Sequence, residues 1–162
     1  MKKHFTAVLA ASALLAIAAP VSAQTPPPYG APITLEQAKK AMAAAEAEQA
    51  KNNWYMVIAI VDSGGRLVML HRGENAQYGS IDVAREKAET AVAFRRPTKV
   101  WQDLIAQGGV HLRLLNITGN AGVLEGAVPI VVDGKVIGGI GASGGTSAQD
   151  AVVAEAGANA LK

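Results

Sequence analysis

The sequence predicts an α+β protein in which an antiparallel sheet is flanked by helices. Apolar runs of strand length and helical periodicities follow one another in the order helix, two strands, two helices, two strands, helix. Short turns join the strands of each pair, Ser63-Gly64-Gly65 in the first and Asp133-Gly134 in the second. Strands joined by hairpins run antiparallel, so a doubly wound nucleotide-binding sheet is not expected.

The chain opens with a predicted secretory signal peptide, residues 1–23. A basic start is followed by an apolar segment, 8–19, and by Val21-Ser22-Ala23, whose small residues suit signal peptidase. The apolar segment is too short to span a bilayer, so we expect no stable membrane insertion. Cleavage after Ala23 predicts a periplasmic or secreted protein that starts with a proline-rich leader arm, 24–33, followed by one domain, 34–162.

The charge balance argues against nucleic acid as a partner. The 162 residues include 15 basic and 13 acidic ones, but Lys2 and Lys3 leave with the signal peptide. The mature chain therefore carries 13 of each, and no basic surface for nucleic acid or anionic lipid is indicated. Its zero net charge and alanine-rich helix faces favour a homo-oligomer. Since there is no cysteine, stability must come from the core.

The first helix and the first strand pair have clear local patterns. Thr34 and Gln37 match a capping box, which starts a helix expected to end near Asn52. The run 54–62 is apolar up to its last residue, which predicts a strand covered on both faces. Alternation in the returning strand, 66–72, predicts that Leu67, Met69 and His71 share one face.

The middle of the chain predicts two helices and a loop. Ser80 is the expected N-cap of a helix within 79–96, whose buried side carries Ile81 and the alanines at 84, 88 and 91. Pro97 ends this helix, and Thr98 is the expected cap of a shorter one, 99–106. The glycine-rich stretch 108–126 has no steady period and predicts a long loop.

The last third predicts a hairpin followed by a helix. Pro129 cannot donate to a ladder, so strand 127–132 lies at an edge or carries a bulge. Glycines at 138, 139 and 141 leave strand 135–143 open to close approach by another backbone or a ligand. Thr146 and Gln149 form a second capping box, which begins a helix that reaches about Leu161.

The glycine-rich turn before this helix does not match a nucleotide loop. A P-loop needs a lysine after its glycines, and none occurs between Lys135 and Lys162. A dinucleotide fold needs an acidic residue about 20 positions further on, beyond the end of this sequence. A helix N-terminus can still hold an anion through its amides, while a tight turn packed on the sheet is the structural alternative.

Three segments together resemble the GlcG/HbpS family, which is related to the C-terminal domain of PduO and includes haem-binding proteins. They are "IAIVDSGG", "GSIDVAREKAETAVAFRRPT" and "VPIVVDGKVIGGIGASGGTSAQD". The resemblance covers roughly 34–161. It implies a profilin-like sheet between helices (αβα), assembly into homo-oligomers and, for some relatives, haem as a cofactor with a role in haem capture or redox sensing.

Haem binding requires an axial donor and an apolar slot, and the candidate residues are few. His71 and His111 are the two histidines of the mature chain and the candidate metal ligands. Met69 could line the slot, and Arg95 and Arg96 could pair with propionates. Further candidate donors are Thr98 and Tyr78. Each of these residues also has an ordinary structural alternative, as a core, cap or surface residue.

The sequence favours an exported haem- or tetrapyrrole-binding protein without enzymatic activity. Signatures of enzymes are scarce, because no cysteine nucleophile and no histidine pair at metal-binding spacing occurs. The main alternative is an enzyme or binder of a small carboxylated metabolite. Its ligand would be held at the helix N-terminus formed by Ser143, Gly144, Gly145 and Thr146. A scaffold without a ligand is the third hypothesis.

Overall fold

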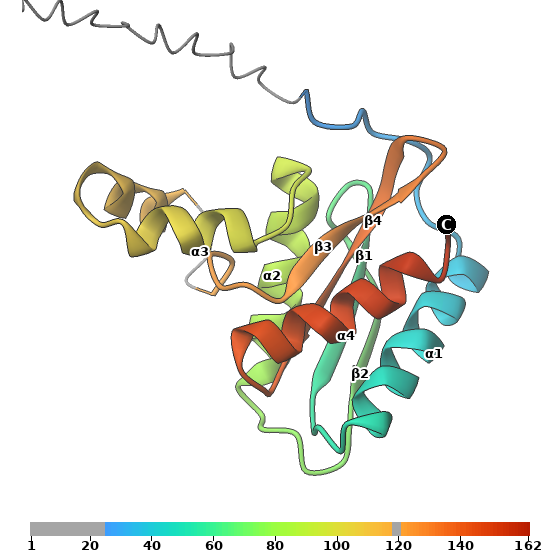
Figure 1. Cartoon of the computed structure of the whole chain (residues 1–162). Coiled ribbons are helices and arrows are strands. Elements are labelled where there is room, and N and C mark those ends of the chain that lie inside the picture. The colour runs from blue at the N-terminus through green and yellow to red at the C-terminus, as the bar shows by residue number, and fades with distance from the viewer. Residues whose placement is uncertain (1–24, 118–120) are drawn as a thin grey trace, which may run out of the picture.

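The computed structural model describes residues 25–117 and 121–162, so the predicted signal peptide lies outside the described residues (Figure 1). The elements are α1 (Leu35–Lys51), β1 (Val57–Asp62), β2 (Leu67–Arg72), α2 (Ser80–Phe94), α3 (Lys99–Ala106), the 3₁₀ helix η1 (Gly109–Asn116), β3 (Ala127–Val132), β4 (Lys135–Ser143) and α4 (Ser147–Asn159). This order confirms the predicted one. The exception is η1, because the stretch expected to be a loop contains a 3₁₀ helix.

The strands form one antiparallel sheet in the order β2-β1-β4-β3. Helices α1 and α4 pack side by side on one face, and α2 covers the other (Figure 1). The α+β prediction is therefore confirmed. Strand β1 is buried along nearly its whole length because it lies between layers of helices, as its unbroken apolar run indicates.

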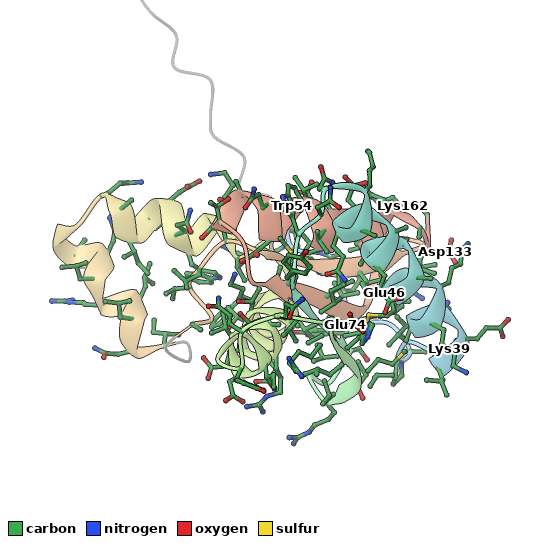
Figure 2. The ribbon with its side chains drawn as sticks, turned by 90° about the horizontal axis from the view of Figure 1, so that it is seen from below. Lys39, Glu46, Trp54, Glu74, Asp133 and Lys162 are labelled. Carbon is green, nitrogen blue, oxygen red and sulfur yellow. The ribbon has the colours of Figure 1, made fainter. Side chains whose placement is uncertain are left out.

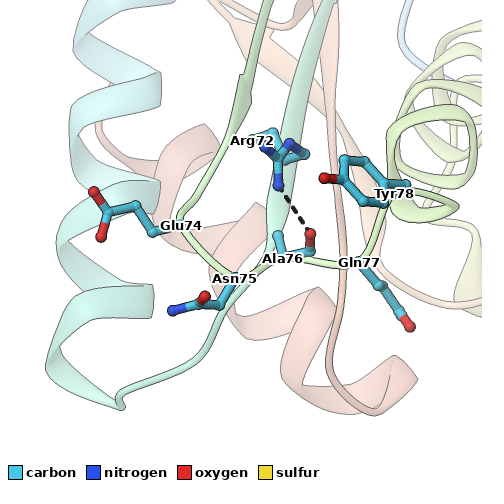
Figure 3. Close-up of a pocket in the computed structure, with 6 residues that line it drawn as sticks. All are labelled: Arg72, Glu74, Asn75, Ala76, Gln77 and Tyr78. Carbon is cyan, nitrogen blue, oxygen red and sulfur yellow. Dashed lines mark hydrogen bonds between the residues drawn. The ribbon is translucent and has the colours of Figure 1, made fainter.

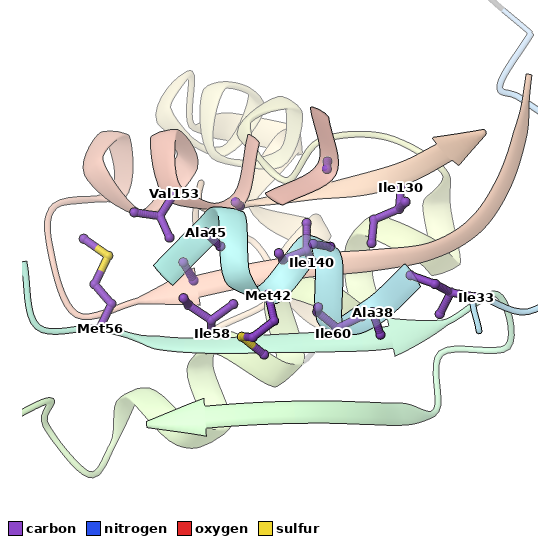
Figure 4. Close-up of a cluster of buried hydrophobic side chains, with 14 of the residues drawn as sticks. Ile33, Ala38, Met42, Ala45, Met56, Ile58, Ile60, Ile130, Ile140 and Val153 are labelled. Carbon is purple, nitrogen blue, oxygen red and sulfur yellow. The ribbon is translucent and has the colours of Figure 1, made fainter. Parts of the chain in front are cut away.

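The main core lies between the sheet and the pair α1 and α4 (Figure 4). Met42 from α1, Ile58 and Ile60 from β1, Ile140 from β4 and Val153 from α4 meet there and are almost completely buried. The buried residues of α1, which are Ala38, Ala41, Met42 and Ala45, recur every three to four positions and so form the one face that packs on the sheet.

On the opposite face, the backbone of α2 lies directly against the glycines of β4. A Cβ atom built on Gly141 would be 2.4 Å from the carbonyl oxygen of Ala84, and one on Gly139 would be 2.8 Å from that of Ala88. A side chain on either glycine would therefore not fit between the two elements. The close approach predicted for these glycines is confirmed, and the approaching backbone belongs to α2.

The predicted caps are confirmed for α1 and α4, and the predicted cap of α2 is wrong. Thr98 is the N-cap residue of α3, as predicted, but it makes no capping hydrogen bond with its side chain. Both capping boxes form, with Gln37 reaching back to Thr34 and Gln149 to Thr146. Gly79, and not Ser80, is the N-cap of α2. The Ser80 hydroxyl pairs with Ser143 and that of Thr98 with Ala127, because these helix starts are buried against strands.

A β-bulge in β2 overturns one predicted feature. Ile60 pairs with Met69, but Val61 pairs with Leu67, so Val68 is an extra residue. Since opposite residues share a face, Leu67 lies on the face of Val61, which packs with α2. Leu67 therefore does not share a face with Met69, which packs against the core beside α1.

At the other edge of the sheet, strand β3 and its turn to β4 have the features predicted from the sequence. Strand β3 is an edge strand, as Pro129 requires, and a bulge follows Ile130. Asp133 and Gly134 both have positive φ values, 49° and 72°, which is typical of a two-residue hairpin turn.

The arm before α1 pairs with the start of β4 through Pro28 and Gly30, so it is part of the folded domain. No helix among the described residues is long and apolar enough to span a membrane.

Replacing Gly141 with alanine should destabilise the protein, because the new Cβ would collide with the backbone of α2. We expect the free energy of unfolding to fall by about 1–3 kcal/mol, the usual cost of overpacking a core. Urea denaturation measures this change. Gly79→Ala is the matched control, since no heavy atom lies within 4 Å of its added Cβ. Equal stability of the two variants would contradict the close contact between α2 and β4.

Candidate functional site

The predicted haem-binding residues do not form a single site. Met69 and His71 lie on β2, at one edge of the sheet, whereas Thr98 bonds to the first residue of β3, at the other edge. Arg95 and Arg96 precede Thr98 at the end of α2. His111 lies on η1, which with α3 extends away from the rest of the domain on the side opposite α1 (Figure 2).

His71 is held by a carboxylate from α1. Its Nδ1 atom forms a short hydrogen bond with Oε1 of Glu46. A carboxylate only accepts, so a neutral ring donates from Nδ1 and keeps the lone pair of Nε2 free. Histidines that bind metals usually have their second nitrogen fixed in this way. The His71 side chain is 53% exposed, and Met69, on the same face, packs partly into the core.

The two arginines hold the arm and the α2–α3 junction. Arg95 has a left-handed backbone, with a φ of 53°, donates to the carbonyl oxygen of Pro27 at 3.2 Å and lies over the ring of Tyr29. Arg96 lies over the ring of Trp101. Both line a hollow of about 760 Å³ whose remaining walls include Pro26, Pro27, Pro97 and Val100. Their pairing with propionates stays a prediction.

Two further candidate donors differ in accessibility. Thr98 is fully buried, and its Oγ1 accepts the N–H of Ala127 at 3.1 Å, so its hydroxyl is already engaged. Tyr78 is 78% exposed, and its ring stacks with the guanidinium of Arg72 (Figure 3). Arg72 also donates to Ala76 O, which fixes the loop around a hollow of about 530 Å³.

In the predicted anion-binding turn, two backbone amides already donate hydrogen bonds to side chains of α4. The N–H of Gly145 donates to Asp150 Oδ1 at 2.9 Å, and that of Thr146 donates to Gln149 Oε1 at 2.9 Å. A Cβ on Gly144 would be 2.4 Å from the carbonyl oxygen of Tyr55, so this turn packs tightly against the residues before β1. The glycines therefore have a structural role, and these two amides are paired within the chain.

A buried ion pair, which the sequence analysis did not predict, lies next to this turn. Lys87 of α2 donates to Asp150 Oδ2 of α4 at 2.8 Å and to the carbonyl oxygen of Ala142 at 3.2 Å. Both charged side chains are almost completely buried. Asp150 also accepts from Gly145, so one carboxylate joins α2, α4 and the glycine turn.

A hydroxyl pair completes this polar cluster. Ser143 Oγ and Ser80 Oγ are 3.1 Å apart, and both residues are buried. The four side chains line a cavity of about 380 Å³, together with Gln77, Gly79, Val83, Leu124, Gly145 and Ser147. The sequence did contain a signal for Lys87: it follows Ala84 by three positions and precedes Ala91 by four, on the predicted buried side.

Metal binding by protein side chains alone has no support in the described residues. No group of three or more His, Asp or Glu side chains in 25–117 and 121–162 is arranged to hold a metal ion. His71 with Glu46 can offer one nitrogen to a metal that brings its other ligands, as the iron of a haem does.

The fold and the sequence together assign the chain to a family. Residues 33–159 match the family described as "Haem degrading protein HbpS-like", and the chain belongs to this family. The protein GlcG of Escherichia coli K12 is 39% identical over 111 residues, which cover 68% of this chain and 81% of GlcG.

Two solved structures share the fold. A double mutant of HbpS from Streptomyces reticuli is 31% identical, with a TM-score of 0.74 over 94% of this chain and 99% of the other. The PduOC:haem complex is 27% identical, with a TM-score of 0.74 over 81% of this chain and 96% of the other. These matches confirm the resemblance inferred from the three sequence segments and the fold that it implied.

Replacing Lys87 with methionine should destabilise the protein strongly, because Asp150 would remain buried without a counter-ion. We expect a loss of about 3–5 kcal/mol in the free energy of unfolding by urea denaturation. The double variant Lys87→Met/Asp150→Asn should recover much of this loss, since an amide oxygen can still accept from Gly145.

Lys99 provides the control for removing a lysine. It is exposed, and its side-chain hydrogen bond to Asp103 raises the pKa of Lys99. Exposed pairs contribute little, so Lys99→Met should leave the unfolding curve almost unchanged. Equal losses in Lys87→Met and in the double variant would show that the buried charge of Asp150 is not the cause.

Proposed function

We propose that this protein binds haem and that His71 is the axial donor. Membership of the HbpS-like family and similarity to the structure of a haem complex support haem as the ligand. The observation that carries the choice of donor is the hydrogen bond between His71 Nδ1 and Glu46, which leaves Nε2 available. A carboxylate partner also makes the ring a stronger donor to iron.

The residues around His71 fit one side of a haem. Met69 lies two positions away on the same face, and the side chain of His71 is open to solvent. Porphyrin also needs a second apolar wall. Strand β2 is an edge strand, so a second copy of the chain could supply that wall. We therefore propose that the functional form is a homo-oligomer that covers the β2 edge.

We further propose that the protein is exported and captures haem outside the cytoplasm. The predicted signal peptide motivates the location. Redox sensing is the second proposed role, and with no cysteine in the chain it would depend on the haem iron. Catalysis of haem degradation would require an added reductant and oxygen, whereas capture requires only the ligand and its donor.

A haemin titration followed in the Soret region tests the donor. The mature protein should bind haemin saturably, and His71→Ala should shift or abolish the Soret signature because the iron loses its nitrogen ligand. Glu46→Gln should weaken binding by about tenfold, the lower end of the effect of removing a hydrogen-bond partner of a ligating histidine.

His111→Ala is the matched control, because it removes the other histidine of the mature chain at a distant position. It should leave the spectrum and affinity unchanged, and far-ultraviolet circular dichroism should confirm that all variants fold. Loss of the signature in His111→Ala with retention in His71→Ala would transfer the donor role to His111. Unchanged spectra in both would reject a histidine donor.

Export and assembly can be tested together by mass spectrometry of protein recovered from the exported fraction. Denatured protein should have the mass of a chain that starts at Gln24, because signal peptidase removes residues 1–23. Under native conditions the mass should be a multiple of that value. A chain that retains Met1 in a cytoplasmic fraction would contradict export, and a monomer at every concentration would contradict assembly.

A further inference from the structure

We propose that the cavity between the starts of α2 and α4 binds a small carboxylate, with Lys87 and the Ser80–Ser143 hydroxyl pair as hydrogen-bond donors. The cavity has a volume of about 380 Å³, within the range of small-molecule sites. Its lining comes from the start of α2, the end of β4 and the start of α4, and it includes neither Met69 nor His71 of β2. This proposal is therefore independent of haem binding.

The donors have unused capacity. An ammonium group has three N–H bonds, and those of Lys87 have two partners among the described residues, Ala142 O and Asp150 Oδ2. The two serine hydroxyls have two protons and share one hydrogen bond. One hydroxyl proton thus remains, whichever serine donates. Lys87, Ser80 and Ser143 all line the cavity.

The acceptors, in contrast, are occupied. Asp150 uses Oδ1 for the amide of Gly145 and Oδ2 for Lys87. The cavity wall therefore offers hydrogen-bond donors to a ligand, while both oxygens of its own carboxylate, Asp150, are already paired. The charge of Asp150 is compensated by Lys87, at 2.8 Å, so it does not stand unpaired against an anion. This combination favours an anion with acceptor oxygens.

The burial of the cluster raises the strength of such contacts. Lys87, Ser80, Ser143 and Asp150 are each at least nine-tenths buried, so a ligand oxygen there competes with little bulk water. Val83 and Leu124 supply an apolar wall for a short carbon chain. The donors come from two elements, α2 and β4, so a ligand with a second oxygen next to its carboxylate could accept from both. Small 2-oxo and 2-hydroxy acids have such an oxygen and are therefore the proposed ligand class.

The test is isothermal titration calorimetry, in which pyruvate or lactate is added to the mature, haem-free protein and the heat of binding is measured. At least one should bind saturably, while 1,2-propanediol, which has no carboxylate, should not. The variant Ser80→Ala/Ser143→Ala removes both hydroxyls and keeps the ion pair. It should weaken binding by about tenfold or more, as expected for a lost hydrogen bond to a charged group.

Two control variants separate this site from general effects. Ser63→Ala, in the β1–β2 turn, and His71→Ala, at the proposed haem donor, should both bind the acid with unchanged affinity. Urea denaturation should show that the double serine variant is folded. Failure of pyruvate and lactate to bind the unmodified protein, or unchanged affinity in the folded double serine variant, would overturn the proposal. Haem binding through His71 would be unaffected by either result.

Discussion

The contact between the backbone of α2 and the glycines of β4 is the constraint on which the other features depend. With no side chain on Gly139 or Gly141, helix and strand meet backbone to backbone. The stem of Lys87 is therefore long enough to pass the strand and reach Asp150 on α4. A larger residue in β4 would lift α2 from the sheet and separate the two charges.

The same contact explains why the polar cluster is inside the protein. Ser80 begins α2 and Ser143 ends β4, so close packing of these elements brings their hydroxyls together. Asp150 then fixes α4 and the glycine turn relative to α2. The hydrogen bonds of this cluster satisfy groups that would otherwise be costly to bury, and they position the start of α4.

Local patterns predicted the parts of the fold that depend on local interactions. The capping boxes and the Asp133-Gly134 turn involve residues close in sequence. The contact surface of β4 could be predicted because its glycines have no side chains. The errors concern tertiary partners. Ser80 resembled a cap, and Thr98 does begin α3, but strands β4 and β3 take up their hydroxyls. The bulge at Val68 depends on pairing with β1.

The candidate sites were harder to predict for the same reason. Glu46 lies 25 positions before His71, and Asp150 lies 63 positions after Lys87, so no spacing rule connects either pair. The sequence could indicate that His71 was one of two available histidines, but not that a carboxylate orients it. It placed Lys87 on a buried face without indicating a counter-ion.

The strand order also determines when the sheet can form as the chain is made. The two central strands, β1 and β4, are separated in sequence by β2, α2, α3, η1 and β3. Until residues 135–143 have been synthesised, β1 has only β2 as a neighbour, and Lys87 lacks its counter-ion until Asp150 has followed. Contacts so distant in sequence close slowly, because the loop entropy must be lost first. The native sheet is therefore completed only once β4 has been made, and the buried ion pair that joins α2 to α4 forms later still.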